Sequence, residues 1–247
     1  MFNWFKSTLT PILSKSAGEP APLPVAPPPE PPKAAPQYYL SKSQMSKIKQ
    51  FLPDYTWAVQ TVGSGIPAFV LAAIHFREAE FATTSKIPGG PFQLDPGGSG
   101  QELTKRIWDY TVKVCKMYKT NMADIETSFN IACLVAAHEF KTKIRNPLTN
   151  PDGTINEDAL ADTLLGYNGR SKNYCEKVQT GNGSDVPHWK FSPYVSSDPH
   201  NGVALKLMGT LPDSTSPTGR KRIETIDKRP GALIVFRELV ARNQELA

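Results

Sequence analysis

Hydrophobic residues recur at three- and four-residue intervals along most of the chain beyond about residue 40, a spacing that is typical of helices. The pattern predicts helices within residues 41–52, 64–81, 101–119, 123–144, 155–169 and 229–246. Residues 170–229 are instead rich in Gly, Ser, Pro and Asp, so we expect that segment to be mainly irregular. The sequence therefore predicts a mainly α-helical fold with at most a small β element.

Proline dominates the chain ahead of this helical region. Nine of the seventeen residues from Pro20 to Pro36 are proline, which favours an extended polyproline conformation and excludes a packed core. We therefore divide the chain into a short amphipathic peptide at 1–18, a proline-rich linker at 19–38 and a single domain at 39–247. The peptide is a candidate docking segment for a partner protein, and the alternative is a frayed terminus.

The amino-acid composition indicates a folded protein but does not identify its partner. The 247 residues are 39% apolar, enough for a sizeable core, and carry a net charge of +5. This modest charge suits an anionic partner such as nucleic acid, a lipid surface or a bacterial wall, and does not choose among them. Because the charge is dispersed, we do not expect nucleic acid as the partner. Three widely spaced cysteines without a C-x-x-C motif indicate neither a disulfide framework nor a zinc site, and we expect no cofactor.

The N-terminal residues do not form a targeting segment of the usual kind. Lys6 and Pro11 interrupt the apolar residues there, so the unbroken apolar run of a signal peptide is missing. No stretch of the sequence approaches the roughly 20 apolar residues that a membrane span needs. We therefore expect synthesis in the cytoplasm without a signal peptide, and no membrane span.

Glu78 occupies a position where a core residue is expected. On an ideal helix it shares a stripe with Leu71 and Ile74, at spacings of seven and four residues. A carboxylate among alkyl groups costs stability unless it has a use. Burial that raises its pKa from about 4.3 to about 6 would make it a proton donor near neutral pH. The alternative is a structural acid paired with His75 or Arg77.

Two later segments carry groups that suit a ligand. The segment Gly89–Gly100, "GGPFQLDPGGSG", has five glycines in twelve residues, which lets a ligand approach the backbone. It lacks the G-K-[ST] ending of a phosphate-binding loop. The segment Gly166–Arg170, "GYNGR", places Tyr167 and Asn168 at the end of a predicted helix, where both side chains can reach a cleft.

The order of "HFREAEF", "GPFQ" and "GYNGR" resembles the signature of lytic transglycosylases and goose-type lysozymes, over about residues 67–170. The resemblance implies a lysozyme-like helical domain that cleaves the β-1,4 bond between N-acetylmuramic acid and N-acetylglucosamine in peptidoglycan, without a metal. It implies that Glu78 is the catalytic acid. It also implies that Gln93, Tyr167 and Asn168 bind the substrate, the latter two as an aromatic-amide pair beside the acid.

The reaction outcome depends on a second carboxylate. A hydrolase needs one to activate water, whereas a lytic transglycosylase uses the sugar's own 6-hydroxyl. Asp95 resembles the loop aspartate of goose-type lysozymes, although a role in the turn before Pro96 is the alternative. Two departures from the family pattern are Ala79, where Ser is usual, and Pro91 and Phe92 in "GPFQ", where Gly-Leu-Met-Gln is usual. We favour the transglycosylase and leave the hydrolase open.

The resemblance also implies where the protein acts. We expect it to act on peptidoglycan glycan strands of the bacterial cell wall after delivery as a component of a phage virion. The N-terminal peptide is then the candidate contact with a virion or assembly protein. Trp189 and Tyr194, in the later segment "HWKFSPYV", are further candidates for stacking on sugar rings. The main alternative is a lysozyme-like structural or assembly protein of a virion that has no activity.

Overall fold

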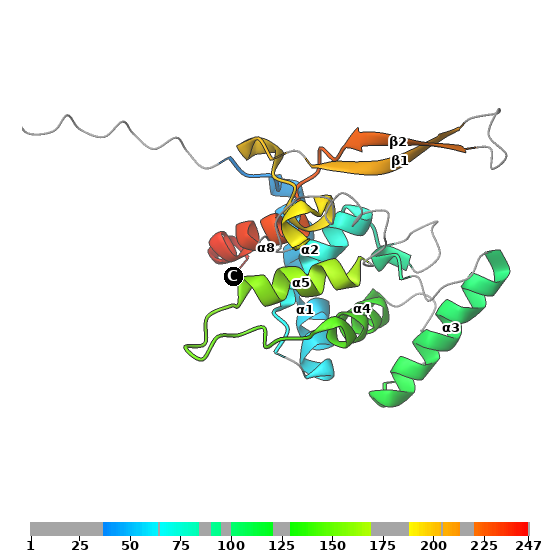
Figure 1. Cartoon of the computed structure of the whole chain (residues 1–247). Coiled ribbons are helices and arrows are strands. Elements are labelled where there is room, and N and C mark those ends of the chain that lie inside the picture. The colour runs from blue at the N-terminus through cyan, green and yellow to red at the C-terminus, as the bar shows by residue number, and fades with distance from the viewer. Residues whose placement is uncertain are drawn as a thin grey trace, which may run out of the picture. The chain divides into compact units, whose positions relative to one another are not determined.

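A computed structural model describes residues 37–63, 65–83, 90–94, 100–120, 129–168, 188–203, 205–212 and 220–246. The chain is mainly helical, as the hydrophobic pattern predicts (Figure 1). The longer helices are α1 (Lys42–Val62), α2 (Ala68–Ala79), α3 (Gly100–Met117), α4 (Phe129–Lys143), α5 (Glu157–Tyr167) and α8 (Ala232–Ala241). The short ones are η1 (Gly90–Phe92), η2 (His188–Phe191), α7 (Pro193–Ser196), η3 (Pro199–Asn201) and η4 (Asn243–Glu245). The predicted peptide at 1–18 and residues 19–36 of the predicted linker lie outside the described residues.

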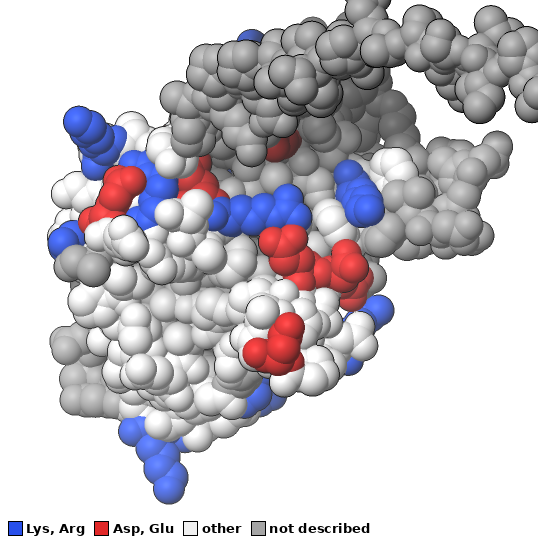
Figure 2. Space-filling model, turned by 90° about the vertical axis from the view of Figure 1, so that its left-hand side faces the viewer, with Lys and Arg blue, Asp and Glu red and all other residues white. Residues whose placement is uncertain are grey.

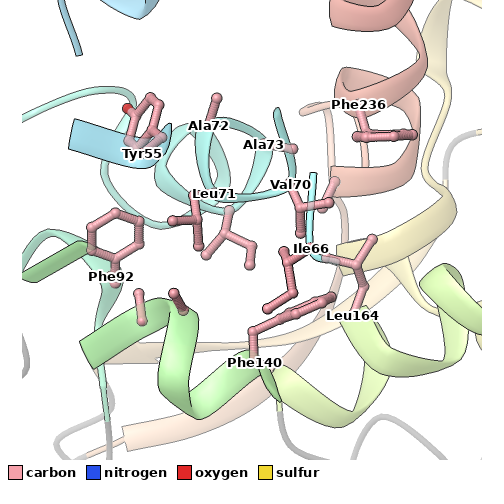
Figure 3. Packing of buried hydrophobic residues seen from close by; sticks show 14 of the residues in the cluster. Tyr55, Ile66, Val70, Leu71, Ala72, Ala73, Phe92, Phe140, Leu164 and Phe236 are labelled. Atoms are coloured by element: carbon pink, nitrogen blue, oxygen red, sulfur yellow. The ribbon is translucent and has the colours of Figure 1, made fainter. Parts of the chain in front are cut away.

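Helix α2 lies at the centre of the hydrophobic core. Its residues from Val70 to Phe76 are all buried, because this segment is apolar on nearly every face. Figure 3 shows its side chains among Phe92 of η1, Phe140 of α4 and Leu164 of α5. Each large apolar side chain buried in this way contributes about 1.5–3 kcal/mol. The packing fixes α2 firmly and so fixes the position of its last turn, which carries Glu78.

Helix α1 continues through a proline to Val62, whereas the predicted helix ends at residue 52. Proline lacks an N–H donor and usually interrupts a helix. Pro53 lies on the exposed face of α1, where solvent can take the place of the missing donor. Phe51 and Tyr55 on the opposite face are buried, and their packing holds the helix together.

A β-hairpin lies in the segment that the sequence predicts to be mainly irregular. Strands β1 (Lys206–Pro212) and β2 (Arg220–Ile226) pair in antiparallel fashion, with Lys206 opposite Ile226 and Pro212 opposite Arg220 (Figure 1). The hairpin agrees with the expectation of at most a small β element, although these particular residues are strands and not irregular. The short strands are separated by a segment rich in turn residues, and their alternation is too brief to stand out in the sequence.

The start of the described chain is clamped to the last long helix. The backbone N–H groups of Tyr39 and Leu40 donate to the carboxylate of Glu238 at 2.9 and 3.0 Å. Arg242 donates to the carbonyl of Leu40 at 2.9 Å and to Glu238 at 2.8 Å. Glu238 and Arg242 are both buried, and charge-assisted hydrogen bonds are strong where water is excluded. The two ends of the described chain therefore form one structural unit.

None of the helices among the described residues combines the length and the apolar character needed to cross a membrane.

Candidate functional site

A cavity of about 170 Å³ opens beside the last turn of α2. Its wall is formed by Arg77, Glu78, Gln93, Asn168, Pro193, Tyr194, Asp227 and Arg229. These residues come from α2, the turn after η1, the end of α5, α7 and the segment between β2 and α8. The fold thus assembles the cavity from distant parts of the chain. Of the residues that the sequence predicts for the site, Glu78, Gln93 and Asn168 lie on this wall.

The predicted glutamine is held against the predicted acid. Gln93 follows η1 with a positive φ of 47°, a backbone conformation that residues other than glycine seldom adopt. Its side-chain Nε2 donates a hydrogen bond to the backbone carbonyl of Glu78. The preceding Phe92 is fully buried and anchors the turn in the core. An unfavourable backbone conformation persists only where its surroundings impose it, and such positions are common at functional sites.

The end of α5 supplies the predicted tyrosine–asparagine pair, and the two side chains have different roles. Asn168 is the C-terminal cap of α5, and its side-chain Nδ2 is buried without a hydrogen-bond partner. The hydroxyl of Tyr167 donates to the carbonyl of Phe92 at 3.3 Å, and Tyr167 does not line the cavity. Tyr167 therefore supports the turn that carries Gln93, whereas Asn168 presents an unused donor at the cavity.

Glu78 is half-buried and remains protonated to unusually high pH. Burial is the main cause, and it raises the pKa of the Glu78 carboxyl from its ordinary value of 4.5 to about 7. The nearby hydroxyl of Tyr194 and the charges of Arg77 and Arg229 lower the pKa and offset part of the rise. A carboxyl group whose pKa lies near the working pH suits a general acid.

No family model matches the chain, and no curated protein or solved structure matches it either. The resemblance to lytic transglycosylases therefore depends on the three short sequence motifs alone. In the structure, one residue from each of these motifs lies on the wall of the same cavity: Glu78, Gln93 and Asn168.

The neighbours of Glu78 on α2 are bonded to other groups. Nη2 of Arg77 lies 2.6 Å from Oδ2 of Asp227, in an ion pair whose side chains are both 3% exposed. One ring nitrogen of His75 donates to the carbonyl of Ala82 at 2.7 Å, so the other accepts from a buried tyrosine hydroxyl at 2.7 Å. Burial lowers the pKa of His75 to about 4, which keeps it neutral. These contacts do not support the alternative that Glu78 is a structural acid paired with either residue.

Sequence reasoning missed the charged residues ahead of α8. Asp227 is 4% exposed and also accepts from Nε of Arg229 at 3.3 Å, while Nη1 of Arg229 donates to the carbonyl of Arg77 at 3.1 Å. Burial alone would raise the pKa of Asp227, but hydrogen bonds and charges from the two arginines hold it below its usual value. Asp227 is therefore a fixed anion. Its only signal in the sequence is the charged run directly before the final helix.

Tyr194 lies on the wall of the cavity, and its side chain is almost entirely buried. The residue is 5% exposed, and the guanidinium of Arg77 lies 5.3 Å from the ring centroid. The prediction that its ring stacks on a sugar is therefore not supported. Its hydroxyl is buried and has no hydrogen-bond partner of good geometry, so it can donate to Glu78 or to a ligand.

The predicted second carboxylate, Asp95, lies outside the described residues. Within the described ranges, no group of three or more His, Cys, Asp or Glu side chains could hold a metal ion. The acid that shares the cavity with Glu78 is Asp227. The described wall therefore combines one titratable proton donor, one fixed anion, two guanidinium groups and several amide or hydroxyl groups.

Proposed function

We propose that the chain is a lysozyme-like muramidase that cleaves the β-1,4 bond between N-acetylmuramic acid and N-acetylglucosamine in peptidoglycan. The supporting observation is that burial keeps Glu78 protonated near neutral pH on the wall of a cavity. Breaking a glycosidic bond requires a proton on the leaving oxygen, and a positioned acid accelerates such reactions about 10²- to 10⁴-fold. The amides of Gln93 and Asn168 in the same cavity supply the donors and acceptors that N-acetyl groups need.

The proposed reaction uses Glu78 twice. Glu78 gives its proton to the glycosidic oxygen as the bond from that oxygen to C1 of the muramic acid breaks. The resulting carboxylate takes the proton of the 6-hydroxyl of the same sugar, whose oxygen bonds to C1 and closes an anhydro ring. Glu78 thereby regains its proton, and no water is consumed.

Transglycosylation is favoured over hydrolysis by the state of the other acid in the described cavity. Both oxygens of Asp227 are bonded to arginines, Oδ2 to Arg77 and Oδ1 to Arg229. A carboxylate held in this way is a poor base for activating water, because taking up a proton would break both ion pairs. The favoured product is therefore a 1,6-anhydromuramic acid end.

The proposal is tested by incubating the purified full chain with isolated sacculi and identifying the released fragments by mass spectrometry. Anhydro ends are the expected product. Reducing ends would instead indicate hydrolysis, with Asp95 as the candidate base that activates water. Intact sacculi after prolonged incubation would contradict the proposal and leave the inactive virion protein as the better interpretation.

The rate of cleavage is expected to fall as the pH rises through about 7, because Glu78 must carry a proton and the pKa of its carboxyl is about 7. Initial rates at low substrate concentration and constant ionic strength measure this limb of the pH profile. A decline already complete near the ordinary glutamate pKa of 4.5 would contradict the assignment of Glu78 as the acid.

The charges on the face shown in Figure 2 give little support for a nucleic-acid partner. On the described part of the face in Figure 2, Lys and Arg side chains are interspersed with Asp and Glu and form no single-sign stripe.

We also propose that the protein reaches the wall as a virion component attached through residues 1–18. Deletion of residues 1–18 should then remove the protein from purified particles without changing cleavage of isolated sacculi.

A further inference from the structure

The cavity carries an excess of positive charge whenever Glu78 is protonated. Two arginines, Arg77 and Arg229, share the single carboxylate of Asp227. The side chain of Arg77 is only 3% exposed: its Nη1 donates to the carbonyl of Pro230 at 3.2 Å and its Nη2 pairs with Asp227, while its Nε is buried without a hydrogen-bond partner. The charge that remains available to a ligand therefore belongs to Arg229.

Arg229 is placed to bind a ligand and still be held in position. Its Nε bonds to Asp227 and its Nη1 bonds to the carbonyl of Arg77, which fixes the plane of the guanidinium. Its Nη2 has no partner among the described residues, and the side chain is 46% exposed. A guanidinium that is fixed on one side and open on the other is suited to carboxylate recognition.

Two uncharged donors on the same wall are also unused. Nδ2 of Asn168 and the hydroxyl of Tyr194 are both buried without a hydrogen-bond partner, and Tyr194 as a whole is 5% exposed. Buried polar groups are nearly always paired in folded proteins, so such groups on a cavity wall indicate a ligand that supplies acceptors. Together with Arg229 they favour an anion that is rich in oxygen.

We propose that this cavity contains a carboxylate-binding subsite, in which Arg229 takes the carboxylate of a muramic acid residue while Asn168 and Tyr194 donate to neighbouring oxygens. The identity of the sugar depends on the proposed function, whereas the preference for a carboxylate depends on the charges and donors of the cavity. Muramic acid carries a lactyl carboxylate when its stem peptide has been removed. A stem peptide replaces that group by an amide and brings carboxylates of its own.

Binding measurements test the subsite without requiring cleavage. The affinity of the full chain is compared, by calorimetry or NMR titration, for N-acetylmuramic acid and for its neutral lactyl methylamide. The wild type should prefer the acid, and Arg229→Gln should lose this preference, with about a 10- to 100-fold weaker affinity for the acid and little change for the amide. Lys228→Gln is the matched control, since it removes the same charge from an exposed neighbour that does not line the cavity.

Further arms identify the carboxylate and separate a local role of Arg229 from general damage. One arm measures the affinity for a muramic acid residue that bears a stem peptide. If this ligand binds as tightly as the free acid, and with the same dependence on Arg229, the peptide supplies the carboxylate. Arg229→Lys should retain part of the preference, since it keeps the charge but not the fork of donors. Melting temperatures recorded for each variant check that the fold is intact.

Equal affinity of the wild type for N-acetylmuramic acid and for its methylamide would contradict the proposed subsite. So would Arg229→Gln weakening both ligands alike, because that pattern indicates a structural effect. These results are independent of cleavage: sacculi that are cleaved without any preference for the carboxylate contradict the subsite alone. A wild type that prefers the acid but leaves sacculi intact contradicts the proposed reaction and not the subsite.

Discussion

Glu78→Gln is expected to reduce the release of fragments from sacculi by at least about 10³-fold, within the range that a positioned general acid contributes. Gln fills the same space and keeps a hydrogen-bonding group, but it cannot give a proton to the leaving oxygen. Fragment release under the same conditions, normalised to protein concentration, measures the loss. Activity within a few-fold of the wild type would remove Glu78 from the mechanism.

Glu80→Gln is the matched control for this substitution. Glu80 is the C-terminal cap of α2, exposed and two residues beyond Glu78, so the same Glu-to-Gln replacement is made there without touching the cavity. Its activity should stay close to that of the wild type.

The pH dependence of the free energy of unfolding shows whether Glu78→Gln loses activity because it unfolds or because it lacks the proton donor. The folded protein holds the Glu78 proton with a pKa of about 7, above the ordinary value of 4.5, so the wild type loses stability as the pH rises through that interval. The interval corresponds to about 3 kcal/mol. Glu78→Gln has no such titration and should be at least as stable as the wild type above pH 7.

Asp227→Ala is expected to lower the free energy of unfolding by about 3–5 kcal/mol, because it leaves a guanidinium buried without its counter-ion. The Arg77 side chain is 3% exposed, so solvent relieves little of this cost. Chemical denaturation at neutral pH measures the change.

Glu157→Ala is the control, since the ion pair between Arg237 and Glu157 has comparable geometry, 2.5 Å, but both side chains are 46% exposed. Its loss should cost about 0–1 kcal/mol. The double variant Arg77→Met with Asp227→Leu should recover much of the stability lost in Asp227→Ala, since no buried charge remains. Equal losses in Asp227→Ala and Glu157→Ala would show that the ion pair at the cavity is not critical for folding.

The parts of the fold and site that could be predicted from sequence are those encoded by short-range patterns. The apolar run of α2 identifies a buried helix, and the stripe through Leu71 and Ile74 identifies Glu78 as a carboxyl in an apolar place. Asn156 at the start of α5 accepts a hydrogen bond from Ala159, as a capping asparagine does. The start of α5 and the position of the acid therefore follow from residues within a few turns of each other.

The rest of the site depends on contacts that no local pattern contains. Asp227 and Arg229 reach the cavity because the chain returns to α2 some 150 residues later, and ion pairs between distant segments leave no periodicity to detect. The different roles of Tyr167 and Asn168 also depend on a distant contact, because Tyr167 bonds to the carbonyl of Phe92. Helix α1 continues through Pro53 because the packing of neighbouring side chains outweighs the local tendency of proline to break a helix.

The clamp that joins Tyr39 and Leu40 to Glu238 has a mechanical consequence. Tension applied through the proline-rich segment ahead of residue 37 enters the domain at these two residues and passes directly into α8 through several hydrogen bonds that share the load. Bonds loaded in parallel break together, whereas a frayed end would peel one turn at a time. A protein tethered by its N-terminus would therefore resist being pulled open by movement of the tether.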